Sequence, residues 1–117
     1  MDSPEQALLT DLYTAFNKRD IPTLLAALTP DVTWPNGWEG GVLHGREMVG
    51  AYWRRQWEQL APTVTPTAFS TEADGRIAVT VHQVVHDKTG LKLADHTVTH
   101  VYRFDRGLVT EMEIRET

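Results

Sequence analysis

Three short turn signals, each ending in glycine, divide the second half of the chain into segments of alternating apolar and polar residues. The turn signals are Asp74-Gly75, Lys88-Thr89-Gly90 and Asp105-Arg106-Gly107. Glycine at the end of such a segment supplies the positive φ that a tight hairpin turn needs. The alternation between the turns has the period of strands with one buried face. We therefore predict an antiparallel meander of strands that begin near Thr63, Arg76, Leu91 and Leu108.

The turns also predict which residues lie opposite each other. A three-residue loop at 105–107, together with a pairing of Lys88 with Leu91, gives four further cross-strand pairs: Phe104 with Leu108, His100 with Met112, Gln83 with His96, and Val79 with His100. In both hairpins this register places Gln83, His96 and His100 on the same face as the apolar residues, because side chains alternate along a strand.

The first half of the chain has helical periodicity instead. Ser3-Pro4-Glu5-Gln6 is a typical helix start, and the apolar residues that follow recur at helical spacing. We predict helices from Pro4 to Asn17, from Pro22 to about Leu28 and from Arg46 to about Leu60, with an extended segment at Pro30–Pro35 and a loop at Asn36–Gly45 that holds a brief strand at Val42–His44.

These elements predict a single α+β domain over residues 1–117. Three helices would pack on one face of a curved, twisted antiparallel sheet, and such a sheet leaves a cavity on its concave side. A hydrophobic fraction of 41% and a charged fraction of 23% are those of a folded globular protein.

Composition excludes several classes of function. The chain has no cysteine, so it has neither a disulfide nor a thiolate nucleophile. Its net charge of -5 argues against nucleic-acid binding, and no apolar run approaches the ~20 residues of a membrane span. The first residues lack the features of a signal peptide, so we expect a cytoplasmic protein without a nucleic-acid or membrane partner.

The histidine spacings do not favour a metal site. His82 and His86 are four residues apart, as are His96 and His100. On a strand this spacing separates two side chains by ~13 Å, which is too far for one metal ion. We expect His82 and His86 to lie on the outer face, and no metal or cofactor.

His100 lies in the middle of a predicted strand, among valines and aromatic residues, on the inner face. One interpretation is a core histidine whose polar atoms are satisfied by a neighbour. The other is a hydrogen-bond donor or general acid/base that faces a cavity. His96 and Gln83 share this face, and His96 is nearer the strand end, as a residue of the cavity rim would be.

Aromatic residues provide candidate walls for such a cavity. Trp34 and Trp38 flank the glycine-rich loop, whereas Trp53 lies on an apolar helix stripe that is most simply core. Tyr13 and Tyr52 carry hydroxyls on apolar helix faces and need partners if they are buried. The full set of predicted contacts for a small apolar ligand is Tyr13, Trp34, Asn36, Trp38, Tyr52, Trp53, Gln83, His96, Tyr102 and Met112.

Several sequence segments match one known family in order and kind. They are Phe16-Asn17-Lys18-Arg19-Asp20, Leu28-Thr29-Pro30-Asp31-Val32-Thr33-Trp34, His44-Gly45-Arg46-Glu47 and His100-Val101-Tyr102-Arg103-Phe104-Asp105-Arg106-Gly107-Leu108-Val109. The chain thereby resembles the nuclear transport factor 2-like superfamily, which includes ketosteroid isomerases and SnoaL-like polyketide cyclases. The resemblance implies a cone-shaped α+β fold around a hydrophobic pocket, a homodimer and no cofactor.

The resemblance does not imply ketosteroid isomerase activity itself. The position of that family's carboxylate base matches Asn36, or Pro35 if the loop slips, and its oxyanion-hole tyrosine matches Leu12. Tyr13 is one residue further and about 100° around the helix. The family's protonated oxyanion-hole aspartate matches His100, so His100 is the candidate catalytic residue, as a general base or an oxyanion donor.

We therefore expect a small-molecule pocket protein, with the activity of a cofactor-independent isomerase, cyclase or dehydratase on a small apolar, carbonyl-bearing or cyclic substrate. A non-catalytic ligand-binding domain and a dimeric interaction domain are the alternatives. The dimer contact would use the outer sheet face, through Thr80, His82, Val84, Thr97, Thr99 and Val101.

Overall fold

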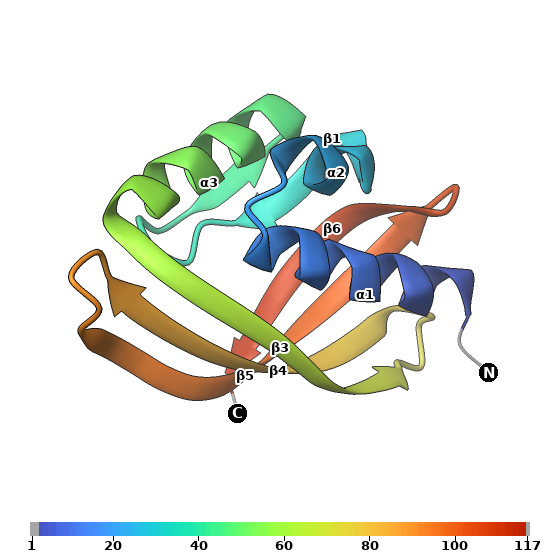
Figure 1. The fold of residues 1–117 in the computed structure, drawn as a ribbon. Helices are drawn as coiled ribbons and strands as arrows, with labels where there is room; N and C mark the ends of the chain where they lie inside the picture. The colour runs from blue at the N-terminus through green and yellow to red at the C-terminus, as the bar shows by residue number, and fades with distance from the viewer. Residues whose placement is uncertain (1–2, 117) are drawn as a thin grey trace.

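The computed structural model describes residues 3–116, which form three helices and a six-stranded sheet (Figure 1). The helices are α1 (Pro4–Asn17), α2 (Ile21–Ala26) and α3 (Arg46–Gln59). The strands are β1 (Leu28–Pro35), β2 (Val42–His44), β3 (Leu60–Thr71), β4 (Ile77–Asp87), β5 (Lys92–Asp105) and β6 (Leu108–Glu116). The predicted α+β class is confirmed.

Local sequence signals set the starts of the first two helices. The Ser3 hydroxyl accepts a hydrogen bond from the Gln6 amide at 3.1 Å, and the Asp20 carboxylate accepts one from the Thr23 amide at 3.3 Å. Each bond satisfies an amide that has no partner inside the helix. Helix α2 ends before the predicted Leu28, because Leu28 is already in β1 and lies beside Val109 of β6.

The sheet has the strand order β2-β1-β6-β5-β4-β3 and is open, with β2 and β3 at its edges. The prediction of a wholly antiparallel sheet is wrong, because β1 runs parallel to β6. Turn signals report only on strands that are neighbours in sequence. The pairing of β1 with β6 joins the first strand to the last described strand and leaves no such signal.

The predicted register of β4 and β5 is confirmed: Gln83 lies opposite His96, and Val79 lies opposite His100. The predicted register of β5 and β6 is wrong. Arg106 and Gly107 have φ of 54° and 84° and form a two-residue turn, so that Asp105 pairs with Leu108. Both central residues of this kind of hairpin turn need positive φ.

Phe104 lies opposite Val109, in the register that the turn sets. A bulge between Arg103 and Phe104 then shifts the β5–β6 register by one more residue, so that His100 lies opposite Ile114. A bulge leaves one extra residue on one strand and changes which face its neighbours occupy. Val109 and Met112 are therefore both in the core, although they lie three residues apart along the strand.

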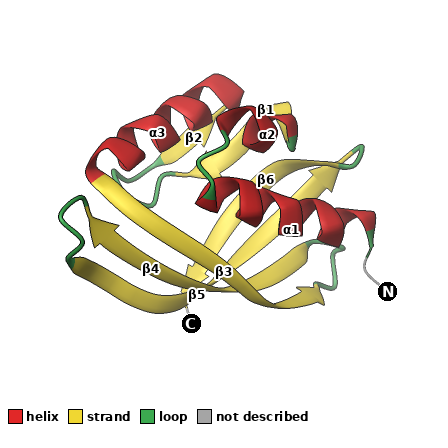
Figure 2. Ribbon diagram, in the orientation of Figure 1, coloured by secondary structure: helices red, strands yellow, loops and turns green. Residues whose placement is uncertain are grey.

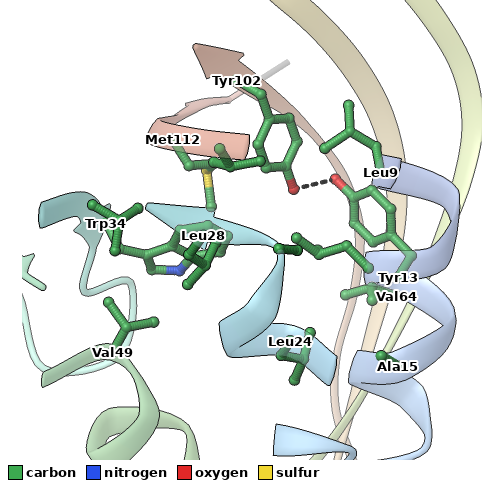
Figure 3. Packing of buried hydrophobic residues seen from close by; sticks show 14 of the residues in the cluster. Leu9, Tyr13, Ala15, Leu24, Leu28, Trp34, Val49, Val64, Tyr102 and Met112 are labelled. Atoms are coloured by element: carbon green, nitrogen blue, oxygen red, sulfur yellow. Dashed lines mark hydrogen bonds between the residues drawn. The ribbon is translucent and has the colours of Figure 1, made fainter. Parts of the chain in front are cut away.

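All three helices cover the same face of the sheet (Figure 2). The apolar core lies between these two layers, and Figure 3 shows part of it, with labelled side chains from the three helices and from β1, β3, β5 and β6 converging. Its largest fully buried side chains include Trp53, Tyr102, Leu9, Leu24 and Leu28.

The opposite face of the sheet carries ion pairs. Arg76 contacts Glu113 at 2.9 Å and Asp74 at 2.8 Å, and His82 lies 2.6 Å from Asp95. Val101 is only 1% exposed within the single chain, so it is not available for the dimer contact in which we had placed it. The homodimer itself stays a prediction. No helix among residues 3–116 is long and apolar enough to cross a membrane.

Candidate functional site

A cavity of about 530 Å³ lies between the helices and the sheet. Helices α1 and α3, the segment that follows β1 and the inner faces of β3–β6 all contribute to its lining. His100, at 8% exposure, lies deep in it, whereas the exposed side chains of Trp38 and His96 mark where it reaches the surface. The volume is in the range of sites for drug-sized molecules.

The deep end of the cavity holds three polar side chains in one chain of contacts. The Tyr13 hydroxyl lies 2.9 Å from Nδ1 of His100 and 2.7 Å from the Tyr102 hydroxyl. The Tyr13 ring also stacks on the imidazole at a centroid distance of 6.0 Å. Figure 3 shows the two tyrosine hydroxyls pointing at one another from α1 and β5. Tyr13 therefore connects the helix layer to the sheet at this site.

Burial determines the charges of this group. It lowers the pKa of His100 to about 4, because the imidazolium loses its hydration. It raises the pKa of the Tyr102 hydroxyl, and it raises that of Tyr13, whose phenolate would also be repelled by Tyr102. All three side chains are uncharged at pH 7.

The direction of the hydrogen bonds follows from counting protons. Tyr13 has one proton, so it donates to one neighbour and accepts from the other. If Tyr13 donated to Tyr102, the Tyr102 hydroxyl would have no acceptor among residues 3–116, because Tyr13 is its only hydrogen-bonding partner there. A buried hydroxyl without an acceptor costs ~1–3 kcal/mol. We therefore assign Tyr102 as the donor to Tyr13, and Tyr13 as the donor to Nδ1 of His100.

This assignment leaves the imidazole proton on Nε2. Nε2 of His100 has no hydrogen-bond partner among residues 3–116, and this atom is not fully buried. The residue lines the cavity, so Nε2–H is a donor available to a bound molecule. The arrangement can stabilise an oxygen atom that gains negative charge.

The second group of polar side chains lies toward the cavity mouth. The Gln56 amide donates to the Tyr52 hydroxyl at 3.4 Å, from one turn further along α3. Gln83 and His96 line the cavity from β4 and β5 and face each other across the sheet. Burial raises the pKa of Tyr52, so its hydroxyl is also neutral.

Aromatic rings form much of the wall. Trp34 and Trp53 meet edge to face at a centroid distance of 5.4 Å, and Phe16 meets Trp53 in the same way at 6.1 Å. All the predicted site residues except Asn36 line the cavity. Their role in binding stays a prediction.

Asn36 lies outside the lining and has a local role. Its side-chain oxygen accepts hydrogen bonds from the amides of Trp38 and Glu39, at 3.2 and 2.7 Å, and its amide donates to the Glu39 carboxylate at 3.0 Å. Such bonds are typical of asparagine in a turn. We therefore remove Asn36 from the candidate site.

Several residues of the lining were not predicted. Phe16 and Gln56 contribute to the cavity, as does Leu12, which is adjacent to Tyr13 on α1. Tyr13 is about 100° around the helix from Leu12, and its hydroxyl nevertheless reaches His100. The spacing of Phe16 and Gln56 on the apolar stripes of their helices was the available signal, but the same spacing is typical of core residues.

Metal-binding groups are not assembled anywhere in the described part of the chain. Residues 3–116 contain no cluster of three or more His, Asp or Glu side chains that could hold an ion. The lining itself includes no Asp, Glu, Lys or Arg from these residues. Its polar side-chain groups are hydroxyls, amides, indole N–H groups and two imidazoles.

The low pKa of His100 predicts an acid-sensitive stability. In the unfolded chain the pKa of this imidazole is about 6.5, so it binds a proton between pH 7 and pH 5. In the folded chain the pKa of His100 is about 4, so it stays neutral over this interval. Unfolding thus takes up a proton, and the free energy of unfolding should fall by about 2 kcal/mol over this interval. Urea denaturation at both pH values measures it.

His100→Gln is the control for this prediction. The variant lacks the titrating group, so its free energy of unfolding should change much less between pH 7 and pH 5. Exposed carboxylates with lowered pKa, such as Asp74 and Asp95, lose their partners only at lower pH. Equal pH dependence in both proteins would show that His100 is not held neutral.

Comparison with known proteins places this chain in a family. The profile of the SnoaL-like domain matches residues 9–112, which is nearly the whole chain. The chain belongs to the SnoaL-like family. No curated protein matched this SnoaL-like chain.

Solved structures share the SnoaL-like fold. A nuclear transport factor 2-like protein of unknown function from Burkholderia pseudomallei is 30% identical, with a TM-score of 0.85 over 99% of this chain and 92% of its own. TerC co-crystallized with polyporic acid is 25% identical, with a TM-score of 0.84 over 98% and 92%. A Mycobacterium tuberculosis protein in complex with estradiol-17β-hemisuccinate is 21% identical, with a TM-score of 0.83 over 97% and 93%, and shows likeness of fold alone.

Proposed function

We propose that this SnoaL-like domain binds a small, largely apolar, carbonyl-bearing or cyclic compound and acts on it as a cofactor-independent isomerase, cyclase or dehydratase. His100 donates its Nε2–H to the substrate oxygen as negative charge develops there. The observation that carries the proposal is the buried, neutral imidazole, with Nδ1 occupied by Tyr13 and Nε2 free toward an aromatic cavity.

The same observation favours a donor over a general base. A base with a conjugate-acid pKa of about 4 is weak at pH 7. A neutral donor in a site of low polarity is effective, because its dipole is fixed in place before the charge forms. Tyr13 and Tyr102 strengthen the Nε2–H donor, since each donates toward Nδ1 on the other side of the imidazole along the chain of hydrogen bonds.

The ligand class follows from the lining. Rings of Trp34, Trp53 and Tyr102 offer flat apolar surface, which suits a cyclic or aromatic molecule. The absence of charged Asp, Glu, Lys and Arg side chains from the described lining favours an uncharged compound, because a buried charge needs a partner. Two of the structural relatives were crystallised with cyclic molecules.

A second candidate function is binding without catalysis. The lining residues among 3–116 include no carboxylate that could abstract a proton, and His100 is a weak base. A domain of this kind would hold the same ligands and release them unchanged. Turnover measurements separate the two candidates.

Both candidate functions require ligand binding. A thermal-shift screen of phenols, naphthols and cyclic ketones against the wild type and His100→Ala tests it. These compounds present the oxygen of an enolate or a carbonyl. At a hundred times its Kd a ligand stabilises the folded state by about 2.7 kcal/mol, which raises Tm by several degrees. We expect shifts with the wild type that are much smaller with His100→Ala.

His86→Ala is the matched control, because His86 is a histidine outside the cavity lining. It should retain the shifts of the wild type. If no compound stabilises the wild type, the cavity does not bind this class of ligand and the proposal fails. If the shifts persist in His100→Ala, the cavity binds ligands but not through His100.

A further inference from the structure

Gln83 and His96 are a pair of cavity side chains with unused hydrogen-bonding capacity. They lie directly opposite each other on β4 and β5, and both line the cavity. Neither side chain makes a hydrogen bond to another side chain or to the backbone within residues 3–116. Among the other hydroxyl, amide and imidazole side chains of the lining, Tyr13, Tyr102 and His100 bond one another, as do Tyr52 and Gln56.

This pair is well separated from the deep polar group. His96 precedes His100 by four residues on the same strand, and both face the cavity. Four residues of strand span about 13 Å. Val98 lies between the two histidines on the same face and is buried. The cavity therefore has a polar group at each end of an apolar stretch.

We infer that Gln83 and His96 form a second polar pole, which binds a hydroxyl or carbonyl group at the far end of an elongated ligand whose first oxygen contacts His100. The inference rests on the proposed function and adds the shape of the ligand to it. The compound has two oxygen functions roughly 8 to 13 Å apart, joined by a flat apolar ring system.

The chemistry of the pair fits a neutral oxygen function. The Gln83 amide offers both donors and an acceptor, and an imidazole offers one of each when neutral. A hydroxyl group needs both a donor and an acceptor, and the pair supplies them from two adjacent strands. A ligand without the second oxygen would leave both side chains to the solvent at the mouth, where His96 is exposed.

The pair therefore affects which ligands bind more than it affects the hydrogen bond between the first ligand oxygen and His100. Binding the second oxygen replaces hydrogen bonds to water, so its gain is modest, about tenfold in Kd. The gain depends on ligand length, because an oxygen placed too near the first one meets Val98 instead. Gln83 and His96 thus distinguish elongated ligands from short ones.

The test compares 4-hydroxybiphenyl with 4,4′-dihydroxybiphenyl, which differ only in the second hydroxyl. Calorimetric titration gives Kd for the wild type and for Gln83→Met combined with His96→Leu. We expect the wild type to bind the dihydroxy compound about tenfold more tightly, and the double variant to bind both compounds alike. Its affinity for 4-hydroxybiphenyl should change much less than its affinity for the dihydroxy compound, and its circular dichroism spectrum should match that of the wild type, which shows that the variant is folded.

His86→Leu serves as the control, because it removes an imidazole outside the lining and should keep the preference of the wild type. A wild type that binds both compounds equally would overturn the inference but leave the proposed function intact. A preference that survives in the double variant would overturn it as well. Failure of both compounds to bind the wild type would overturn the proposed function and this inference together.

Discussion

Replacing His100 by alanine should slow the exchange of α-protons in a bound cyclic ketone about a hundredfold. The reason is the loss of the Nε2–H donor that stabilises the enolate oxygen, and removing one such donor costs ~10²–10³ in rate. The probe is 2-tetralone in deuterated water, followed by NMR. Solvent takes the α-proton, the enolate oxygen accepts the hydrogen bond, and a deuteron from solvent returns to the carbon.

His100→Gln distinguishes a donor from a base. A glutamine amide donates a hydrogen bond but does not take up a proton at neutral pH. The exchange rate of this variant should stay within about tenfold of the wild type if His100 acts as a donor. A loss as large as that in the alanine variant would identify His100 as a base. If the wild type itself does not accelerate exchange, the catalytic proposal fails and the binding function remains.

Replacing Trp53 by alanine should reduce the free energy of unfolding by about 3–5 kcal/mol, as truncation of a buried aromatic side chain does. Trp53 is 2% exposed and contacts the rings of Phe16, Trp34 and Trp57, so its loss opens a space between α1, α3 and β1. A domain of this size has a total stability of ~5–15 kcal/mol. Urea denaturation at pH 7 measures the change.

Trp38→Ala is the comparison for this prediction. Trp38 also lines the cavity but is 39% exposed, so less of its surface leaves water on folding. Its replacement should cost less than about 1 kcal/mol. Equal losses in the two variants would show that Trp53 is not a core residue of the folded chain.

The sequence predicted the faces of β4 and β5 well because their alternation is long and regular. Gln83, His96 and His100 lie where the periodicity placed them. The register of β5 and β6 was two residues in error, one from the turn at Arg106 and one from the bulge at Arg103. Two shifts of one residue restore the original face, which is why Met112 still lines the cavity.

The contacts at the deep end could not be predicted. Tyr13 and His100 are 87 residues apart in sequence, and their contact depends on how α1 lies across the sheet. Helical periodicity places Tyr13 toward the sheet but does not specify its partner. Asn36 was predicted as a ligand contact from its place in a loop beside the cavity. Its side chain instead bonds the backbone of its own turn and does not line the cavity.

The position of β6 inside the sheet also bears on how the chain acquires its structure during synthesis. Strand β6 is the last described strand, yet it lies between β1 and β5, and the Val109 amide donates to the carbonyl of Ala27 at 2.9 Å. While the chain is being made on the ribosome, β1 lacks this neighbour until residues 108–116 have emerged. Contacts between such distant segments slow folding, so apolar residues of the earlier elements stay exposed until β6 has been made.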